Sequence, residues 1–282
     1  MTAAENRPAE SGPAEDGPAE GGEVLPPKTE HPAAPFTLAI DIGGTGLKAS
    51  VLDAKGAMVA DRLKVQTTYP CPPEKLVDDL TRLTQPLPNY ERISAGFPGM
   101  VRAGHVLTAP HFVTKNGPGT DVDPELLKKW TDFDLAGALT QHLGHPAKVA
   151  NDADLQGAAV VEGKGFELVI TLGTGFGTAS FYDGHLLPHF EFAHTPFRKG
   201  ETYNDQLGER TRKDIGEERW SKRVHRAIDN FRALVFFDKC WIGGGNARRL
   251  DRSKLPDDVA IVDNTAGILG GIKLWEEKHV AL

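Results

Sequence analysis

The sequence predicts an α/β fold built from two related halves, and three observations lead to this prediction. After residue 35, apolar runs of strand length alternate with amphipathic segments of helical period, which is typical of α/β proteins. A strand, a glycine turn and a second strand follow one another near residue 41 and again near residue 173. The first 34 residues lack this patterning. The repeated hairpin suggests two halves that face each other across a cleft.

Residues 1–34 are predicted to be a disordered, acidic tail. Pro-Ala-Glu recurs at Pro8, Pro13 and Pro18, and large apolar side chains are nearly absent. Such a segment cannot bury enough area to offset the entropy of ordering it. We divide the rest into a small N-terminal lobe, residues 35–147, and a larger lobe, residues 148–265. A C-terminal helix within residues 266–282 is expected to complete the first lobe.

Composition excludes several classes of protein. The chain has 282 residues, of which 39% are hydrophobic and 25% charged, and this suits a globular core. The net charge of -7 argues against a general nucleic-acid binder. No apolar run reaches the ~18 residues that a membrane helix needs, and no secretory signal is visible. Cys71 and Cys240 are isolated, which indicates a reducing compartment. We therefore expect a cytoplasmic protein without nucleic-acid or membrane partners.

The first half should contain three strands, a helix and a fourth strand. In chain order these span residues 38–42, 47–52, 58–66, 74–83 and 92–97. The helix opens at Pro72 or Pro73, because proline is favoured in a first helical turn. The chain is then less regular up to a helix at residues 134–143 that begins near Asp134. A short strand, residues 148–150, and a helix, residues 153–162, follow.

The second half should repeat the strand, turn and strand of the first. Its expected strands span residues 166–172, 179–182, 240–242 and 259–262. Residues 202–214 are polar and predict a short helix plus a turn. A long amphipathic helix is expected over residues 217–237, because apolar side chains recur there at helical spacing. Asn264 is expected to cap a last helix that starts at residue 266.

Asp41 interrupts the first apolar run just before a glycine turn. A carboxylate at the end of a core strand is costly to bury without a cation or hydrogen-bond donors. Glycines lack Cβ and let backbone N–H groups approach an anion closely. Together these features indicate a metal–phosphate site. The alternative is an ordinary glycine-rich hairpin capped by Asp41, and this turn alone does not decide between the two.

The ordered motifs D-I-G-G-T-G, N-D-A-D, L-G-T-G-F-G, E-F-A-H and I-G-G-G resemble those of the ROK sugar kinases. The likeness is nearest to the bacterial polyphosphate glucokinases of that family and covers about residues 36–278. The resemblance implies an actin-like ATPase (ribonuclease H-like) fold, with two α/β lobes around a cleft. It also implies a homodimer.

By this resemblance, Asp152 is the catalytic base. A sugar hydroxyl is a poor nucleophile at neutral pH, and a carboxylate within hydrogen-bond reach can take its proton during phosphoryl transfer. The alternative is that Asp152 only caps the helix that follows, a role that Asn151 or Asp154 would fill equally well.

Glu191 and His194 match the family's Glu-x-Gly-His sugar-binding stretch, with Ala193 in place of glycine. A carboxylate and an imidazole can hold neighbouring sugar hydroxyls and reject analogues that lack them. The alternative is a surface acid and an unrelated histidine. Asn151 would add a further hydroxyl contact. Asn116 is a weaker candidate, because its loop departs from the family's usual pattern.

The resemblance also assigns the phosphate sites. Asp41 would hold Mg²⁺, the cofactor that we expect, and no structural zinc is expected because residues 194–216 contain no cysteine. Gly43, Gly44, Thr45 and Gly46 would line the transferred phosphate. Gly173, Thr174 and Gly175 would hold the phosphates of the donor. Gly243, Gly244 and Gly245 resemble the stretch that lies near adenosine in the ATP-using relatives.

Residues 198–226 contain a local excess of basic side chains, which would suit a polyanion such as polyphosphate. A solvated helix face with ion pairs is the alternative. The basic residues are Arg198, Lys199, Arg210, Arg212, Lys213, Arg219, Lys222, Arg223 and Arg226.

The expected activity is Mg²⁺-dependent phosphoryl transfer to the 6-hydroxyl of glucose, which gives glucose 6-phosphate. Polyphosphate is the expected donor, and ATP is the second candidate donor. One alternative is an ATP-dependent ROK kinase for another hexose or an amino sugar. Another is a non-catalytic, sugar-responsive regulator. Residues 1–34 cannot form the N-terminal helix-turn-helix that ROK repressors carry, which argues against a regulator.

Overall fold

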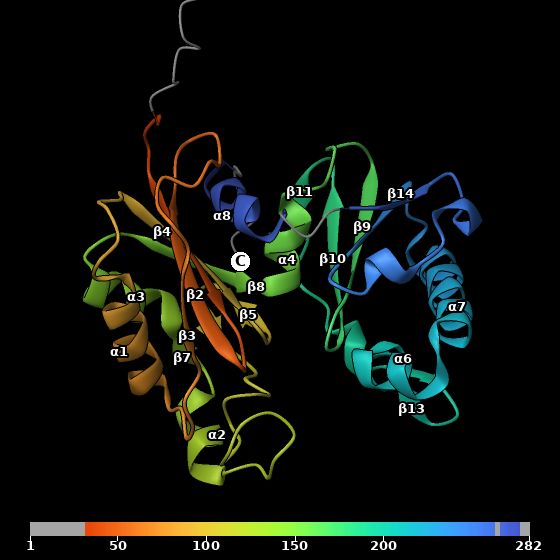
Figure 1. Cartoon of the computed structure of the whole chain (residues 1–282), viewed down its shortest axis with the longest axis horizontal. Helices are drawn as coiled ribbons and strands as arrows, with labels where there is room; N and C mark the ends of the chain where they lie inside the picture. The colour runs from red at the N-terminus through yellow and green to blue at the C-terminus, as the bar shows by residue number, and fades with distance from the viewer. Residues whose placement is uncertain (1–31, 263–265, 277–282) are drawn as a thin grey trace, which may run out of the picture. The chain divides into compact units, whose positions relative to one another are not determined.

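The computed structural model describes residues 32–262 and 266–276, and two five-stranded sheets dominate them (Figure 1). The first sheet has the order β3-β2-β1-β4-β8, and the second has the order β11-β10-β9-β14-β15. Most of the predicted tail and the predicted cap Asn264 lie outside the described residues. No helix among the described residues is long and apolar enough to cross a membrane.

The first sheet is an antiparallel hairpin continued by two parallel strands. β1 pairs antiparallel with β2, while β1 with β4 and β4 with β8 pair in parallel. Its strands are β1 (Thr37–Ile42), β2 (Gly46–Leu52), β3 (Leu63–Gln66), β4 (Arg92–Phe97) and β8 (Ala147–Asn151).

The second sheet repeats this arrangement, with an antiparallel β9–β10 hairpin and the parallel pairs β9–β14 and β14–β15. The shared topology places each glycine turn at the same point of its sheet. Its strands are β9 (Phe166–Leu172), β10 (Phe176–Tyr182), β11 (His185–Leu186), β14 (Lys239–Gly243) and β15 (Val259–Ile261).

Two predicted strand positions need correction. The strand expected at residues 58–66 begins only at Leu63. Met58 forms an isolated antiparallel bridge to Leu52, and the Ser50 hydroxyl donates to the carbonyl of Ala60, so this segment stays beside β2 but does not continue the register of β3. The sequence predicts that the strand at residues 148–150 belongs to the second lobe, but β8 pairs with β4 in the first sheet. A division between lobes therefore falls after β8, and the two-lobe division itself stays a prediction.

Helices cover both faces of the first sheet (Figure 1). α1 (Pro73–Thr84) and α3 (Leu135–Leu143) lie on one face, and α8 (Ala266–Glu276) contacts β1 and β4 on the other. Pro73 occupies the first turn of α1, and the Asp134 side chain accepts from the N–H of Gly137 as the N-cap of α3. Both helix starts are as predicted. α4 (Asp152–Ala158) packs against α8.

α4 ends four residues earlier than predicted, at Ala158 instead of Glu162. The carboxylate of Glu167, which is buried on β9, accepts hydrogen bonds from the N–H groups of Glu162, Gly163 and Lys164. These amides would otherwise continue the helix, so a side chain from the next strand ends it.

The second sheet packs against a long helix, α7 (Glu217–Val235), whose side chains Trp220, Val224 and Phe231 are buried. The polar region at residues 202–214 forms two helices, α5 (Tyr203–Leu207) and α6 (Glu209–Ile215). The remaining short elements are β5 (Val101–Arg102), β6 (His105–Val106), α2 (Pro124–Trp130), β7 (Phe133–Asp134), η1 (Phe192–His194), β12 (Pro196–Arg198), β13 (Glu201–Thr202), η2 (Ala247–Arg249) and η3 (Arg252–Lys254).

Close contact of α8 with α4 requires a glycine at position 270. A Cβ added to Gly270 would lie 1.6 Å from the carbonyl oxygen of Leu155, whereas one added to Gly271 would lie 3.2 Å from Cβ of Ser94. We expect Gly270→Ala to lower the free energy of unfolding by about 3 kcal/mol or more. Gly271→Ala is the matched control and should change it by about 1 kcal/mol or less, because alanine favours helix. Denaturant unfolding measures both, and equal effects would contradict this packing.

Candidate active site

Asp41 and Asp152 come together across a glycine. Asp41, on β1, is the register partner of Lys48 on β2 and of Gly96 on β4. Register partners in neighbouring strands place their side chains on the same face of a sheet. A Cβ added to Gly96 would lie 3.6 Å from Cα and 3.8 Å from Cβ of Asp152. The missing side chain of Gly96 therefore lets the first residue of α4 approach the strand beside Asp41.

Asn151, and not Asp152, caps α4. Its Oδ1 accepts from the N–H of Ala153 at 2.8 Å, and its Nδ2 donates to the carbonyl of Gly99 at 2.9 Å. Both ends of the buried amide are thus engaged in holding the helix start. Asp152 also accepts from the N–H of Ala153, at 2.9 Å, through Oδ1. The geometry favours a structural part for Asn151, whose predicted sugar contact stays a prediction.

The pKa of Asp152 is raised to about 7. Burial is the largest cause, and the negative charges of Asp41, Asp154 and Glu191 add to it, while the N–H of Ala153 opposes the shift. A carboxylate with a pKa near the working pH is a much stronger base than an ordinary aspartate, and about half of it is ionised at that pH. The surroundings of Asp152 thus suit proton abstraction at neutral pH.

A pH–rate profile follows from this value. Because a general base must be ionised, we expect kcat/KM to rise with pH and to level off above about pH 7. Initial rates between about pH 5 and about pH 9, at constant ionic strength, measure the profile. An ordinary aspartate would give a profile that is already flat above about pH 5, and this result would contradict the environment described for Asp152.

Two further carboxylates, Asp154 and Glu191, contact the same histidine near Asp152. Asp154, on the same helix, is buried, and its Oδ1 lies 2.9 Å from Nδ1 of His189. Nε2 of His189 lies 3.8 Å from Oε2 of Glu191, which immediately precedes η1. His194, which the sequence predicts to bind the sugar, is exposed at the end of η1, and its sugar contact stays a prediction. The histidine that the fold pairs with Glu191 is therefore His189, which the sequence analysis does not assign.

Hydrogen bonds and a neighbouring loop hold the first glycine turn, residues 43–46, in place. The N–H of Gly43 donates to the carbonyl of Gly46 at 3.1 Å. The hydroxyl of Tyr69 donates to the carbonyl of Gly44 at 2.6 Å. A Cβ on Gly44 would meet His111 and Pro118 at 2.9 Å, so the loop that carries them lies against the turn. Thr45 is exposed at the tip of the turn.

The second glycine turn is one residue shorter than the first, and it is closed by a hydrogen bond from the N–H of Gly173 to the carbonyl of Gly175 at 3.0 Å. Nδ2 of Asn246 donates to the carbonyl of Gly173 at 2.9 Å. Asn246 directly follows the predicted donor-binding residues 243–245, so these lie beside the turn. Gly244 has φ +87°, and a Cβ there would lie 2.3 Å from the carbonyl oxygen of Leu172. Thr174 is the middle residue of this turn.

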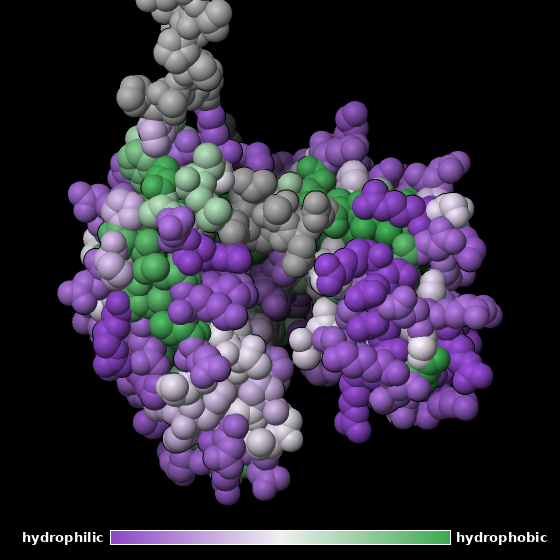
Figure 2. Space-filling model, in the orientation of Figure 1, coloured by the Kyte–Doolittle hydropathy of each residue, from purple (hydrophilic) through white to green (hydrophobic). Residues whose placement is uncertain are grey.

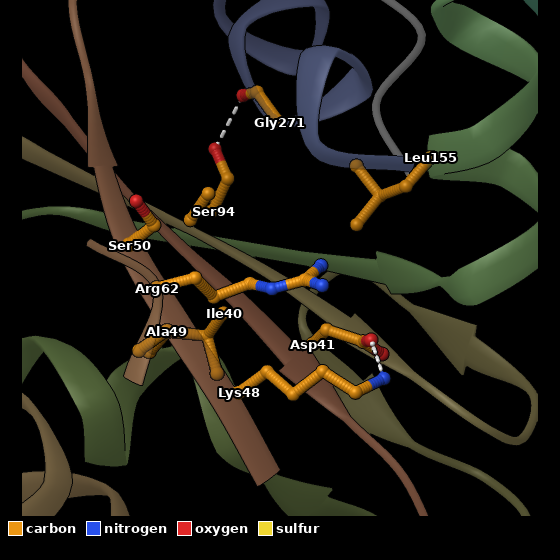
Figure 3. A pocket seen from close by; sticks show the side chains of 10 residues that line it. Ile40, Asp41, Lys48, Ala49, Ser50, Arg62, Ser94, Leu155 and Gly271 are labelled. Carbon is orange, nitrogen blue, oxygen red and sulfur yellow. Dashed lines mark hydrogen bonds and ion pairs between the residues drawn. The ribbon is translucent and has the colours of Figure 1, made fainter. Parts of the chain in front are cut away.

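Figure 3 shows a pocket with Asp41 on its wall. Nζ of Lys48 lies 2.6 Å from Oδ2 of Asp41, and the side chain of Arg62 extends along the same pocket. Two cations at this pocket make this end of β1 favourable for the negative charge of a phosphate group. Lys48 belongs to none of the sequence motifs, but the register of the hairpin places it opposite Asp41.

The residues near Asp41 fit Mg²⁺. Protein-bound Mg²⁺ is usually held by one or two carboxylates, with waters and substrate phosphates completing its shell. The Asp41 side chain is 51% exposed, and Asp152 lies nearby. Within residues 32–262 and 266–276, no group of three or more His, Cys, Asp or Glu side chains could hold a metal ion. The site therefore suits an ion that arrives with a phosphate donor, and the expected absence of zinc stays a prediction.

Asn116 is not brought to the other predicted sugar residues by any contact within the described chain. It is exposed, and its N–H donates to the hydroxyl of Thr120 at 3.1 Å. Its loop is the one that carries Pro118 against Gly44.

Comparison with known proteins gives a consistent set of similarities. Residues 37–191 match the sequence pattern of the ROK family. Polyphosphate glucokinase from Mycobacterium tuberculosis (strain CDC 1551 / Oshkosh) is 28% identical over 251 residues, covering 82% of this chain and 88% of that protein. N-acetylmannosamine kinase from Escherichia coli (strain SE11) is 33% identical over 156 residues, covering 54% of this chain and 49% of that protein.

Solved structures share the fold. Inorganic polyphosphate/ATP-glucomannokinase from Arthrobacter sp. strain KM has a TM-score of 0.70 and 28% identity, covering 86% of this chain and 100% of that chain. A ROK family glucokinase from Streptomyces griseus, in complex with glucose and AMPPNP, has a TM-score of 0.63 and 18% identity, covering 85% of this chain and 98% of that chain.

Proposed function

The chain belongs to the ROK family, and from this membership we propose that it transfers a phosphoryl group from polyphosphate to the 6-hydroxyl of glucose. Its similarity to ROK sugar kinases also confirms the predicted actin-like ATPase (ribonuclease H-like) fold. The observation that carries the proposal is the placement of Asp152, with a pKa of about 7, beside Asp41 on one face of the first sheet.

Each group has a distinct part in the proposed reaction. Asp152 takes the proton of the sugar hydroxyl as that oxygen attacks the terminal phosphorus of the donor. Asp41 holds Mg²⁺, which supplies charge stabilisation for the transferred phosphoryl group. The turns at residues 43–46 and 173–175 offer backbone N–H groups to phosphate oxygens. Glu191 accepts hydrogen bonds from sugar hydroxyls and so orients the ring.

Catalysis by this site depends on position more than on covalent chemistry. The hydroxyl proton ends on Asp152, the new bond joins the sugar oxygen to phosphorus, and the donor leaves with one phosphate fewer. Lys48 and Arg62 lie beside Asp41 and would add positive charge near the donor phosphates. The products are glucose 6-phosphate and the shortened donor.

Two observations support polyphosphate as the donor. The relatives of similar length include polyphosphate glucokinases and a polyphosphate/ATP-glucomannokinase. The chain also carries the basic segment at residues 198–226, and Figure 2 shows mainly hydrophilic residues over α6 and α7. ATP remains the second candidate, because the loop at residues 243–245 lies beside the Gly173 turn.

The structure reduces the number of free cations in the basic segment. Arg212 pairs with Glu217 at 3.1 Å, Lys213 with Glu209 at 2.8 Å, and Lys222 with Glu218 at 2.8 Å. These pairs match the solvated-face alternative. Arg198 and Arg223 differ, because burial and then the charge of Arg198 lower the pKa of Arg223, which places the two guanidinium groups close together. We therefore expect any polyanion contact of this segment at its basic residues outside these three ion pairs, which include Arg198 and Arg223.

A donor-by-sugar activity matrix tests the proposal. Polyphosphate chains of several lengths and nucleoside triphosphates are crossed with glucose, mannose, glucosamine and N-acetyl sugars, with and without Mg²⁺. We expect the highest kcat/KM with polyphosphate and glucose. Preference for ATP with N-acetylmannosamine would favour the alternative of an ATP-dependent kinase for another sugar, since an N-acetylmannosamine kinase is 33% identical over part of the chain. Inactivity with every hexose would contradict the proposed kinase activity and favour the alternative of a non-catalytic, sugar-responsive regulator. The predicted homodimer is tested separately by sedimentation.

A further inference from the structure

A buried histidine joins two carboxylates that belong to different elements. His189 is only 5% exposed in its side chain. Its Nδ1 lies 2.9 Å from Oδ1 of Asp154 on α4, and its Nε2 lies 3.8 Å from Oε2 of Glu191, just before η1. The proposed reaction gives no part to His189 or to Asp154.

Asp154 ties this histidine to the proposed base. It lies two residues after Asp152 on α4 and is itself buried, so its position relative to Asp152 is fixed by the helix. His189 in turn precedes Glu191 by two residues. The hydroxyl of Thr178 on β10 donates to the carbonyl of Phe190 at 3.4 Å, which holds the backbone between them. The connection therefore runs from Asp152 along the backbone of α4 to Asp154, and from there through side-chain contacts to His189 and Glu191.

The charge of His189 suits this position. Burial lowers its pKa, but the contacts with Asp154 and Glu191 outweigh burial and raise that pKa to about 10, so the imidazole is cationic at neutral pH. The charged groups that face it are Asp154, from α4, and Glu191. One cation thus offsets part of the negative charge that Asp152, Asp154 and Glu191 bring together.

Nε2 of His189 is unsatisfied. It is buried and has no hydrogen-bond partner within the described chain. A buried donor without a partner costs about 1–3 kcal/mol, which favours movement of the partly exposed Glu191 carboxylate toward it. Because Nε2 has almost no exposed surface, a sugar cannot reach it directly. Its effect on a sugar must therefore pass through Glu191.

We propose that His189 is a positioning residue that holds the sugar-binding carboxylate of Glu191 at a fixed place relative to Asp152. This inference rests on the proposed function. It makes sugar affinity depend on a histidine that does not touch the sugar. It also explains why Asp154, buried next to the base, has a cationic partner.

The first test is a split between KM and kcat. We expect His189→Gln to raise KM for glucose by about tenfold to about a hundredfold, because misplacing a binding group by about 1 Å has effects of this size. The fall in kcat should be smaller, because Asp152 and Asp41 stay in place. His185→Gln, at the exposed position of β11, is the matched control and should leave both constants unchanged.

A double-mutant cycle separates positioning from general stability. If His189 acts through Glu191, the double variant His189→Gln/Glu191→Gln should lose no more glucose affinity than Glu191→Gln alone. Additive losses would overturn the proposal, as would an unchanged KM in His189→Gln. If His189→Gln does not fold, His189→Asn, which can still donate to Asp154, takes its place in the cycle. A wild-type protein that phosphorylates no sugar would instead overturn the proposed function.

Discussion

Replacing Asp152 by Asn is expected to lower kcat for glucose phosphorylation by about 10²-fold to about 10⁴-fold, the range that a general base contributes. The amide has the same shape as the carboxylate but cannot accept the hydroxyl proton. Its hydrogen bond from the N–H of Ala153 can persist, and Asn151 still caps α4. The start of the helix should therefore remain intact, and glucose should still bind.

The same substitution should make the protein more stable at neutral pH. The folded-state pKa of Asp152 is raised from 3.8 to about 7, so its ionisation opposes folding as the pH rises through this interval, and the full penalty applies above pH 7. The full shift corresponds to at most about 4 kcal/mol, and partial exposure reduces it to about 1–3 kcal/mol. Asp152→Asn removes this penalty. A variant that is both inactive and stabilised distinguishes loss of a base from damage to the fold.

Steady-state kinetics, glucose titration calorimetry and thermal unfolding measure the three effects on one sample. Asp214→Asn, at an exposed position of α6, is the matched control and should change none of them. A loss of less than about 10²-fold in kcat would remove Asp152 from the role of general base.

Replacing Asp41 by Asn is expected to lower kcat/KM by about 10²-fold or more at ordinary Mg²⁺ concentrations, with partial recovery when Mg²⁺ is raised. Asp41 is the side chain that we propose for the metal, and an amide oxygen binds Mg²⁺ more weakly than a carboxylate. The substitution also leaves Lys48 without its 2.6 Å partner. The dependence of rate on Mg²⁺ concentration measures the first effect.

A second effect of Asp41→Asn follows from its place beside Asp152. The charge of Asp41 raises the pKa of Asp152, so its removal should shift the pH–rate profile to lower pH. Asp61→Asn, an exposed acid before β3, is the matched control and should leave the profile in place. An unshifted profile in Asp41→Asn would contradict the proximity of the two carboxylates.

Local patterns are sufficient to predict the parts of the fold that depend on neighbouring residues. Both hairpins follow from apolar runs around glycine turns, and α1 and α7 follow from helical spacing of apolar side chains. The end of α4 depends on burial that a local pattern does not show, because the carboxylate of Glu167 accepts from three nearby amides and also from Nε1 of Trp241, 74 residues away in the sequence. The short strands β5, β6 and β7 have two residues each, too few to show any period.

Some residues of the candidate site can also be predicted from local sequence, whereas others depend on contacts made by the fold. Asp41, Asp152 and the glycine turns lie at the ends of predicted elements, so their sequence positions are informative. The approach of Asp152 to β1 depends on Gly96, which lies on the neighbouring strand β4 and carries no chemistry of its own. The contacts of His189 with Asp154 and Glu191 depend on burial against α4, which a motif cannot show.

Product analysis tests the central claim most directly. Purified protein is incubated with glucose, polyphosphate and Mg²⁺, beside Asp152→Asn, and phosphorus NMR identifies the product. We predict glucose 6-phosphate from the wild-type protein and at most a trace from the variant. Phosphorylation at another hydroxyl, equal product from both proteins, or no sugar phosphate at all would contradict the account.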